Sequence, residues 1–211
     1  EREFWMHQDE KGNRVPNYVI KSPRECKSIV VKPKDLKYRV LMIHKDRKDL
    51  KGTNVLKYIR EGERKGYHLR PTCASRERWY DLGKRNFSQG FWIYVINDRY
   101  ITLLNRELLY CDCELFDIYP KSNDEVLIPL LNSSLTALFS EVESRLGLGQ
   151  GALKKQVYEL YQLGIPKPGL FSIEQANSLQ KAFGNLSKRS IGSVFSELGA
   201  NSPEEASLDK V

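Results

Sequence analysis

The sequence predicts an α/β (α+β) fold with a twisted, mostly antiparallel sheet, flanking helices and a C-terminal helical segment. With 211 residues, 40% of them hydrophobic, the chain can bury the core of one large domain or of one domain with an appendage. Up to Pro120 the apolar residues come in short runs separated by turn residues, which is typical of strands. After Pro120 they recur at helical spacing.

Short apolar runs predict the strands in order. Two runs near the N-terminus flank a turn at Gly12-Asn13, which indicates a hairpin. Residues 28–31 and 38–43 are rich in β-branched or aromatic side chains and predict two further strands. Residues 91–96 are apolar on both alternating faces, as a central strand requires. The sheet is expected to continue through runs within residues 99–105, 108–111 and 114–119.

Capping residues and helical spacing predict the helices. The first begins at Thr53 or Asn54 and stops near Gly66, with apolar residues on one side and Lys57, Arg60, Arg64 and Lys65 on the other. After Pro120, one helix starts behind Ser133 or Ser134 and ends at Gly147, and a second carries Leu153, Val157, Leu160 and Tyr161. We expect these two to form a helical hairpin joined by GLGQG. Residues 164–173 are expected to be a linker, followed by helical patterns around residues 179–186 and 191–198 and a helix start at Ser202-Pro203.

The charge is concentrated in the first part of the chain. Residues 1–90 contain 23 Lys and Arg against 12 Asp and Glu, a net charge of +11, whereas residues 91–211 contain 11 against 15, a net charge of −4. Such polarity favours a polyanionic partner, although basic runs are also found on faces that only contact solvent. No apolar stretch of membrane-spanning length and no signal peptide occurs, so we expect a soluble, cytoplasmic chain without a membrane partner and with reduced cysteines.

Apparent catalytic and metal motifs are weak. GLGQGALK (147–154) follows a helix instead of a strand, which disfavours a phosphate loop. Cys111 and Cys113 lack a second paired cluster for zinc, and the acidic residues from Glu107 to Asp117 lack the nearby lysine of a nuclease core. No G-x-S-x-G nucleophile motif accompanies the three histidines. We therefore assign no catalytic residue and no metal site, and we keep an independent nuclease or zinc enzyme as a minor alternative.

The most informative stretch is GYHLRPTCASRERWYDLG (66–83), which combines three arginines, a histidine, a tryptophan and two tyrosines. Arginine forms paired hydrogen bonds with guanine edges or phosphate, and aromatic rings pack against bases or sugars. In the alternative interpretation, Trp79, Tyr80 and Leu82 anchor the core while the arginines lie in water. One loop can do both.

Three stretches resemble a known family: PNYVIKSPREC, YIREGERKGYHLRPTCASRERWYDLG, and LLNSSLTALFSEVESRLGLGQGALKKQVYELYQLGIPKP. Together they are similar to the C-terminal target-recognition region of adenine-N6 DNA methyltransferases, including those fused into single-chain restriction-modification enzymes, over roughly residues 15–168. The resemblance implies a catalytic domain that binds S-adenosylmethionine and flips the target adenine. The N-P-P-[YF] or D-P-P-[YF] loop and the glycine-rich cofactor turn of that domain are absent from the 211 residues. We therefore expect it N-terminal to Glu1, and we expect this chain alone to be inactive and to bind no cofactor.

The resulting hypothesis assigns sequence-specific recognition of double-stranded DNA to residues 1–168 and a truncated C-terminal helical extension to residues 169–211. The expected partners are duplex DNA and the N-terminal methyltransferase domain of the parent protein. The alternative is a non-catalytic protein-interaction or subunit-docking module. The candidate DNA contacts are Arg70, Arg76 and Arg78, with Tyr67, His68 and Tyr80 near base edges or sugars, and Lys45, Arg47, Lys48, Lys51, Lys84 and Arg85 on phosphates.

Overall fold

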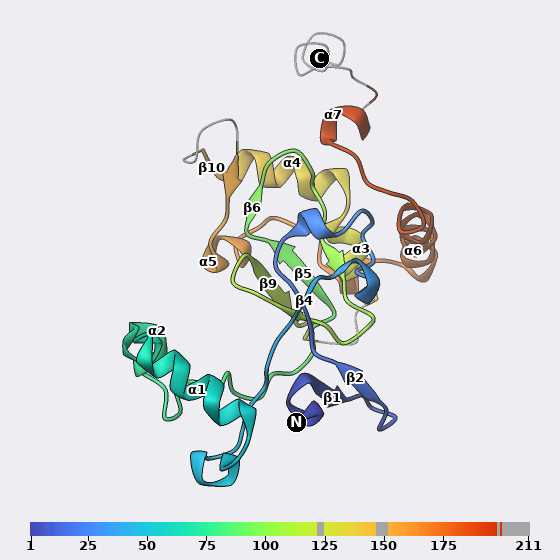
Figure 1. Cartoon of the computed structure of the whole chain (residues 1–211). Helices are drawn as coiled ribbons and strands as arrows, with labels where there is room; N and C mark the ends of the chain where they lie inside the picture. Colours follow the sequence, from blue (N-terminus) through green and yellow to red (C-terminus); the bar gives the residue numbers. More distant parts are fainter. Residues whose placement is uncertain (122–124, 147–151, 198, 200–211) are drawn as a thin grey trace. The chain divides into compact units, whose positions relative to one another are not determined.

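The computed structural model describes residues 1–121, 125–146, 152–197 and 199 (Figure 1). These residues form two compact units: unit 1 comprises Glu1–Val19 and Lys37–Phe87, and unit 2 comprises Ile20–Leu36 and the described residues from Ser88 onward. The predicted boundary between residues 168 and 169 does not coincide with this division, because the short 3-10 helix η6 (Pro168–Leu170) lies within unit 2 on both sides of it. That residues 1–168 form a DNA target-recognition domain stays a prediction.

Unit 1 begins with the predicted hairpin. Strand β1 (Met6–Gln8) pairs antiparallel with β2 (Arg14–Pro16). The turn depends on Asp9, whose carboxylate accepts hydrogen bonds from the backbone N–H groups of Lys11 and Asn13, and on Gly12, whose φ is +79°. The start of β3 (Tyr18–Ile20) then pairs antiparallel with β4 (Tyr38–Arg39). The strand predicted at residues 38–43 is therefore much shorter than expected.

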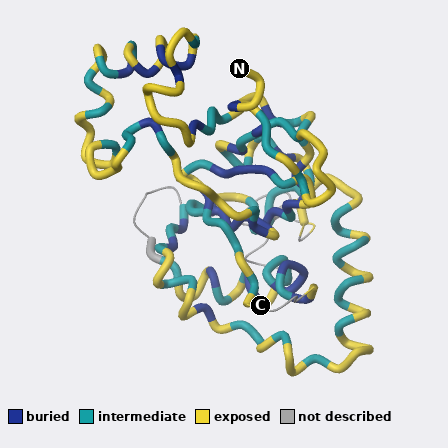
Figure 2. Tube along the Cα trace, turned by 90° about the horizontal axis from the view of Figure 1, so that it is seen from below, coloured by how far each residue is buried: buried dark blue, intermediate teal, exposed yellow. Residues whose placement is uncertain are grey.

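The helices of unit 1 surround a small apolar core. They are the 3-10 helices η1 (Arg2–Trp5), η4 (Arg47–Leu50) and η5 (Tyr67–Leu69), and the α-helices α1 (Asn54–Arg64) and α2 (Pro71–Ala74). As predicted, Thr53 caps α1, because its Oγ1 accepts a hydrogen bond from Leu56 N–H at 3.1 Å, and the chain leaves the helix at Gly66, whose φ is +73°. Buried residues recur every three or four positions along α1, with more exposed residues between them (Figure 2). The core consists of Phe4, Ile43, Leu50, Val55, Leu56, Ile59 and Tyr80.

Unit 2 contains small antiparallel sheets. Strand β5 (Gly90–Ile93) lies between β7 (Leu103–Leu104) and β9 (Leu115–Ile118), and all four of its residues are buried. This confirms the first part of the central strand predicted at residues 91–96, whose last two residues form a separate strand in another sheet. A second sheet has the order β10 (Arg145–Leu146), β11 (Leu153–Lys154), β6 (Val95–Ile96). Strand β8 (Tyr110–Cys111) lies between β7 and β9 in the chain. The predicted strand at residues 28–31 is reduced to an isolated parallel bridge between Val30 and Leu104.

The α-helices of unit 2 are α3 (Leu127–Leu131), α4 (Ser134–Glu143), α5 (Val157–Leu160), α6 (Ile173–Leu186) and α7 (Val194–Glu197). The 3-10 helices η2 (Pro23–Glu25) and η3 (Pro33–Asp35) come before β5 in the chain. Ser133 caps α4 as predicted, with its Oγ accepting from Thr136 N–H at 3.2 Å. The predicted α/β class, with antiparallel sheets and helices, is confirmed, although the sheet is divided into several small ones.

The predicted helical hairpin is wrong. Leu153 is buried and belongs to β11, where it pairs with Ile96 and with Leu146, so the chain forms a strand before the single helical turn of α5. Leu153 is apolar because it is buried in this sheet, and not because it lies on one face of a helix. The connecting GLGQG segment and the helix start at Ser202-Pro203 lie outside the described residues. Within the described residues no helix is long and apolar enough to cross a membrane.

Candidate nucleic-acid interface

All of the predicted DNA-contacting residues lie in unit 1, in the segments 45–51 and 67–85. Unit 1 contains 18 Lys and Arg against 10 Asp and Glu, a formal charge of +8, whereas the rest of the chain contains 16 against 17, a formal charge of −1. The basic character seen in the sequence therefore belongs to one structural unit. What it can bind depends on how many of its cations are already paired with carboxylates.

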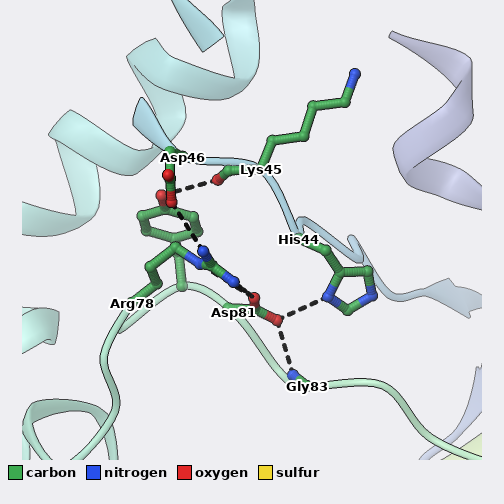
Figure 3. A network of polar contacts seen from close by, with 7 residues as sticks. His44, Lys45, Asp46, Arg78, Asp81 and Gly83 are labelled. Atoms are coloured by element: carbon green, nitrogen blue, oxygen red, sulfur yellow. Dashed lines mark hydrogen bonds and ion pairs between the residues drawn. The ribbon is translucent and has the colours of Figure 1, made fainter. Parts of the chain in front are cut away.

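Arg78 is paired on both sides of its guanidinium (Figure 3). Its Nη1 donates to Asp46 Oδ1 at 2.8 Å, and its Nη2 and Nε donate to Asp81 Oδ2 at 2.8 Å and 3.2 Å. These hydrogen bonds raise the pKa of Arg78. Its guanidinium joins the segment around Asp46 to the loop that carries Arg76, and the expectation that Arg78 contacts DNA stays a prediction.

Asp81 is the centre of this arrangement. Its other oxygen, Oδ1, accepts from Gly83 N–H at 2.8 Å and lies 2.8 Å from His44 Nδ1 (Figure 3). Burial raises the pKa of Asp81, but the hydrogen bonds from Arg78, Gly83 and His44 outweigh it, so that the pKa lies below its ordinary value. The carboxylate stays charged and holds its own loop against the segment that carries His44.

Two aromatic residues of the loop face the protein interior. Tyr80 is 9% exposed, and its hydroxyl donates to the carbonyl oxygen of Lys45 at 3.0 Å. That Tyr80 lies beside a base or sugar stays a prediction. Trp79 packs against the core, and its Nε1 donates to Glu63 Oε1 at 3.0 Å. The alternative of core anchoring is thus right for Trp79 and Tyr80. It is wrong for Leu82, which is 42% exposed.

Other predicted contacts are partly engaged. Arg47 pairs with Glu63, and Lys45 lies 3.7 Å from a carboxylate oxygen of Glu3, but all four side chains are accessible to solvent. Exposed pairs of this kind exchange readily with solvent and are worth roughly 1 kcal/mol or less. Both cations can therefore turn toward a phosphate at small cost.

The remaining predicted contacts differ in their exposure and in their partners. Arg70 is exposed and lies over the ring of Tyr67, with its Cζ 4.6 Å from the ring centroid. His68 is half-buried, and its ring lies 6.5 Å from that of Trp79. Arg76, Lys48, Lys51 and Lys84 are exposed and form no ion pair with any described residue, and Arg85 is also exposed.

Sequence reasoning did not assign the residues that hold the loop. Asp81 follows Arg78 by three residues, a spacing that could have indicated a local pair, but Asp46 is 32 residues away from Arg78 and gives no such signal. Lys57, Arg60 and Arg64 were placed on the outer side of the first helix but were not assigned to the site. They are exposed, on the same helix against which Trp79 packs.

A family model described as the C-terminal domain of the type II methyltransferase M.Eco57I matches residues 17–197. The chain belongs to this family. The match agrees with the resemblance in the sequence to methyltransferase C-terminal regions. No curated protein matches the chain.

Among solved structures, the type IIG restriction endonuclease BpuSI resembles this M.Eco57I-type C-terminal domain with a TM-score of 0.55 and 10% sequence identity. The similarity covers 90% of this chain and 22% of the BpuSI chain. At this identity it shows a shared fold. The M.Eco57I-type domain thus spans about a fifth of the length of the enzyme whose structure it resembles.

The described part of this M.Eco57I-type domain contains no group of three or more His, Cys, Asp or Glu side chains placed to hold a metal ion. Its distinctive feature is a loop whose Trp79, Tyr80 and Arg78 are bound within unit 1 while Arg70 and Arg76 are exposed. This arrangement suits a fixed surface that binds an anionic partner.

Proposed function

We propose that this chain is the specificity domain of a DNA adenine-N6 methyltransferase or restriction-modification enzyme and recognises a sequence in double-stranded DNA. One observation carries the proposal: carboxylates and core contacts hold the loop of residues 66–83 in place, yet Arg70 and Arg76 remain exposed on it. A fixed loop binds with a smaller entropy loss than a mobile one. Its arginines are then presented in a defined geometry, as reading base edges requires.

In this proposal different cations contact the base edges and the phosphates of the duplex. Arg70 and Arg76 contact base edges, with Tyr67 and His68 beside them. Lys48, Lys51, Lys84 and Arg85 contact phosphates, joined by Lys45 and Arg47 when these release their carboxylate partners. Phosphate contacts set the position on the duplex, and base contacts set the sequence.

Methylation itself belongs to another part of the parent enzyme. The 211 residues contain neither an N-P-P-[YF] loop nor a glycine-rich cofactor turn, and they correspond to 22% of the BpuSI chain. We infer that the methyltransferase domain of the parent protein binds S-adenosylmethionine and the flipped adenine. The present chain would choose the site in the cytoplasm and would be inactive alone.

Selection from a pool of random duplexes tests the proposal. The purified chain should enrich a defined sequence, and Arg76→Ala and Arg70→Ala should each relax the preference at one base pair, by about 1–3 kcal/mol. Arg14→Ala on the β1–β2 hairpin is the control. Arg14 is also exposed in unit 1, and its replacement with alanine removes the same charge. The absence of any enriched sequence, or an equal effect of all three substitutions, would refute recognition by the loop.

Subunit docking is the second candidate function. Leu138 and Val142 on α4 are 59% and 74% exposed, which is unusual for apolar residues spaced one helical turn apart. If the chain binds no duplex even at low salt, and Leu138→Ser with Val142→Ser abolishes binding to the parent methyltransferase domain, docking replaces DNA recognition as its function.

A further inference from the structure

Helix α1 carries a row of cations that the proposed DNA-reading loop does not include. Lys57, Arg60 and Arg64 are exposed and are spaced at i, i+3 and i+7, so they lie along one side of the helix. The opposite side is buried through Val55, Leu56 and Ile59. We call the three cations the α1 ridge.

The two acidic residues of α1, Glu61 and Glu63, each have a partner outside this ridge. Glu61 pairs with Lys65 at 2.7 Å, and Glu63 accepts hydrogen bonds from Arg47 and from Trp79 Nε1. Lys57 Nζ donates to the neutral amide oxygen of Asn54 at 3.2 Å. Neither Arg60 nor Arg64 forms an ion pair with any residue in the described part of the chain. Three positive charges therefore remain available to a ligand.

The ridge is particular to this helix. Helix α4 contains no Lys or Arg, and α6 contains Lys181 alone, although both are of similar length to α1. A basic face that served only solubility would not need to be confined to one helix. The charge is concentrated where Trp79 joins α1 to the loop that carries Arg76.

The dimensions of the ridge match a nucleic-acid backbone. Seven residues of α-helix separate Lys57 from Arg64, a length of about 10 Å. One strand of a duplex has a phosphate about every 3.4 Å along the axis, so about three phosphates lie within that length. Lysine and arginine side chains are long enough to adjust to such a row without fixed partners on the helix.

We infer that the α1 ridge binds the phosphate backbone of a duplex and sets the position of the loop of residues 66–83 on it. The inference rests on the proposed function, because it assigns the backbone contact of the same DNA-binding unit. The ridge contributes affinity that does not depend on sequence, whereas Arg70 and Arg76 contribute the sequence preference.

The test is the salt dependence of duplex binding. The triple variant Lys57→Gln/Arg60→Gln/Arg64→Gln is titrated with a fluorescent random duplex of about 25 base pairs between about 50 and 200 mM salt. The slope of log K against log salt is negative, and each lost phosphate contact should make it less negative by about 0.9. The triple variant should therefore have a slope less negative by about 2.7. The affinity at about 0.1 M salt should fall by up to roughly 500-fold. The ratio of specific to random affinity should not change.

The matched control is Arg2→Gln/Lys11→Gln/Arg14→Gln, which removes the same charge from exposed positions of the same unit. If both triple variants make the slope less negative to the same extent, the effect is that of net charge, and the ridge is not a binding site. The three single ridge variants, each expected to make the slope less negative by about 0.9, provide the same test if the triple variant does not fold.

The outcomes separate the two proposals. An unchanged slope in a folded ridge variant, with normal sequence-specific binding by the wild-type chain, would overturn the ridge alone. If the wild-type chain binds no duplex, the proposed function fails and the ridge fails with it. Weaker binding of the ridge variant to anionic phospholipid vesicles, with unchanged duplex binding, would assign the ridge to a membrane surface and overturn the inference.

Discussion

Gly62 allows the arginine loop to lie against α1, and the substitution Gly62→Ala tests this packing. A Cβ added at Gly62 would lie 2.5 Å from Cη2 and 3.0 Å from Cζ2 of Trp79, whereas carbon atoms in contact prefer about 3.5–4.0 Å. Trp79 cannot easily move away, because its Nε1 is bound to Glu63 and its ring packs edge-on against Tyr80 at 6.1 Å.

Two effects of opposite sign determine how Gly62→Ala changes the free energy of unfolding. Replacing glycine with alanine inside a helix gains about 1 kcal/mol of helix propensity. Inserting a methyl group into an occupied contact costs about 1–3 kcal/mol. Since the overlap is with a ring that is held in place, we expect the second effect to dominate, and Gly62→Ala should lower the free energy of unfolding by about 1 kcal/mol.

Gly184 provides the matched control. It lies in α6, and a Cβ added there would meet no atom within 4 Å, so Gly184→Ala should raise the free energy of unfolding by about 0.5–1 kcal/mol. Urea unfolding followed by far-UV circular dichroism measures both variants. If the two units unfold in separate transitions, each variant is compared with the wild-type transition of its own unit.

A double variant identifies the cause. With Trp79→Leu the indole is absent, and Gly62→Ala should then stabilise the protein by up to about 1 kcal/mol relative to Trp79→Leu alone. If Gly62→Ala stabilises the wild-type chain as much as Gly184→Ala does, the indole does not occupy the space beside Gly62. The anchoring of the loop through Trp79 would then be incorrect.

Three other measurements test the charge network and the thiols. The pKa of Asp81 lies below its ordinary 3.8, so its stabilising effect is present above about pH 3.8 and is lost as the pH falls through the lower folded-state value. Melting temperatures between about pH 5 and 2 should therefore fall more steeply for wild type than for Asp81→Asn, and parallel curves would contradict the shift. Burial raises the pKa of the Cys26 thiol to about 12, so iodoacetamide should alkylate the exposed Cys113 well before Cys26, and equal rates in mass mapping would contradict this. Asp46→Asn/Asp81→Asn makes the chain more positive, yet it should weaken binding to the selected duplex by releasing Arg78; tighter binding in a fluorescence titration would show that net charge alone governs affinity.

Features determined by neighbouring residues were predictable from the sequence. The caps at Thr53 and Ser133 depend on a hydroxyl that accepts a hydrogen bond from the backbone three residues later. The positive φ values of Gly12 and Gly66 follow from the conformational freedom of glycine at a turn and at a helix end. The central strand at residues 90–93 was recognisable because both of its faces are buried.

Features determined by distant residues were not predictable. Leu153 and Tyr161 share a helical period in the sequence, but Leu153 pairs with Ile96 in a sheet while Tyr161 is 87% exposed. Hydrophobic spacing reports which residues are buried, and a strand contact from elsewhere in the chain can produce the same spacing as a helix. In the same way, nothing near Arg78 in the sequence indicates that Asp46 binds it.

The carboxylates of unit 1 are distributed unevenly among its cations. If the carboxylates near the loop were spread over its surface, they would weaken its field and leave its side chains mobile. Instead Asp46 and Asp81 bind Arg78, and Glu63 binds Arg47 and Trp79. Asp46 and Asp81 thus engage an arginine that joins two segments of unit 1, whereas Arg76, next to the exposed Glu77, forms no ion pair with any described residue. A count of charges in the sequence cannot separate paired from unpaired cations, because Arg76 and Arg78 are two residues apart and only Arg78 is bound by carboxylates. The pairing of Arg78 therefore supports recognition by Arg76, since an arginine that reads a base needs a backbone that stays in place when the ligand arrives.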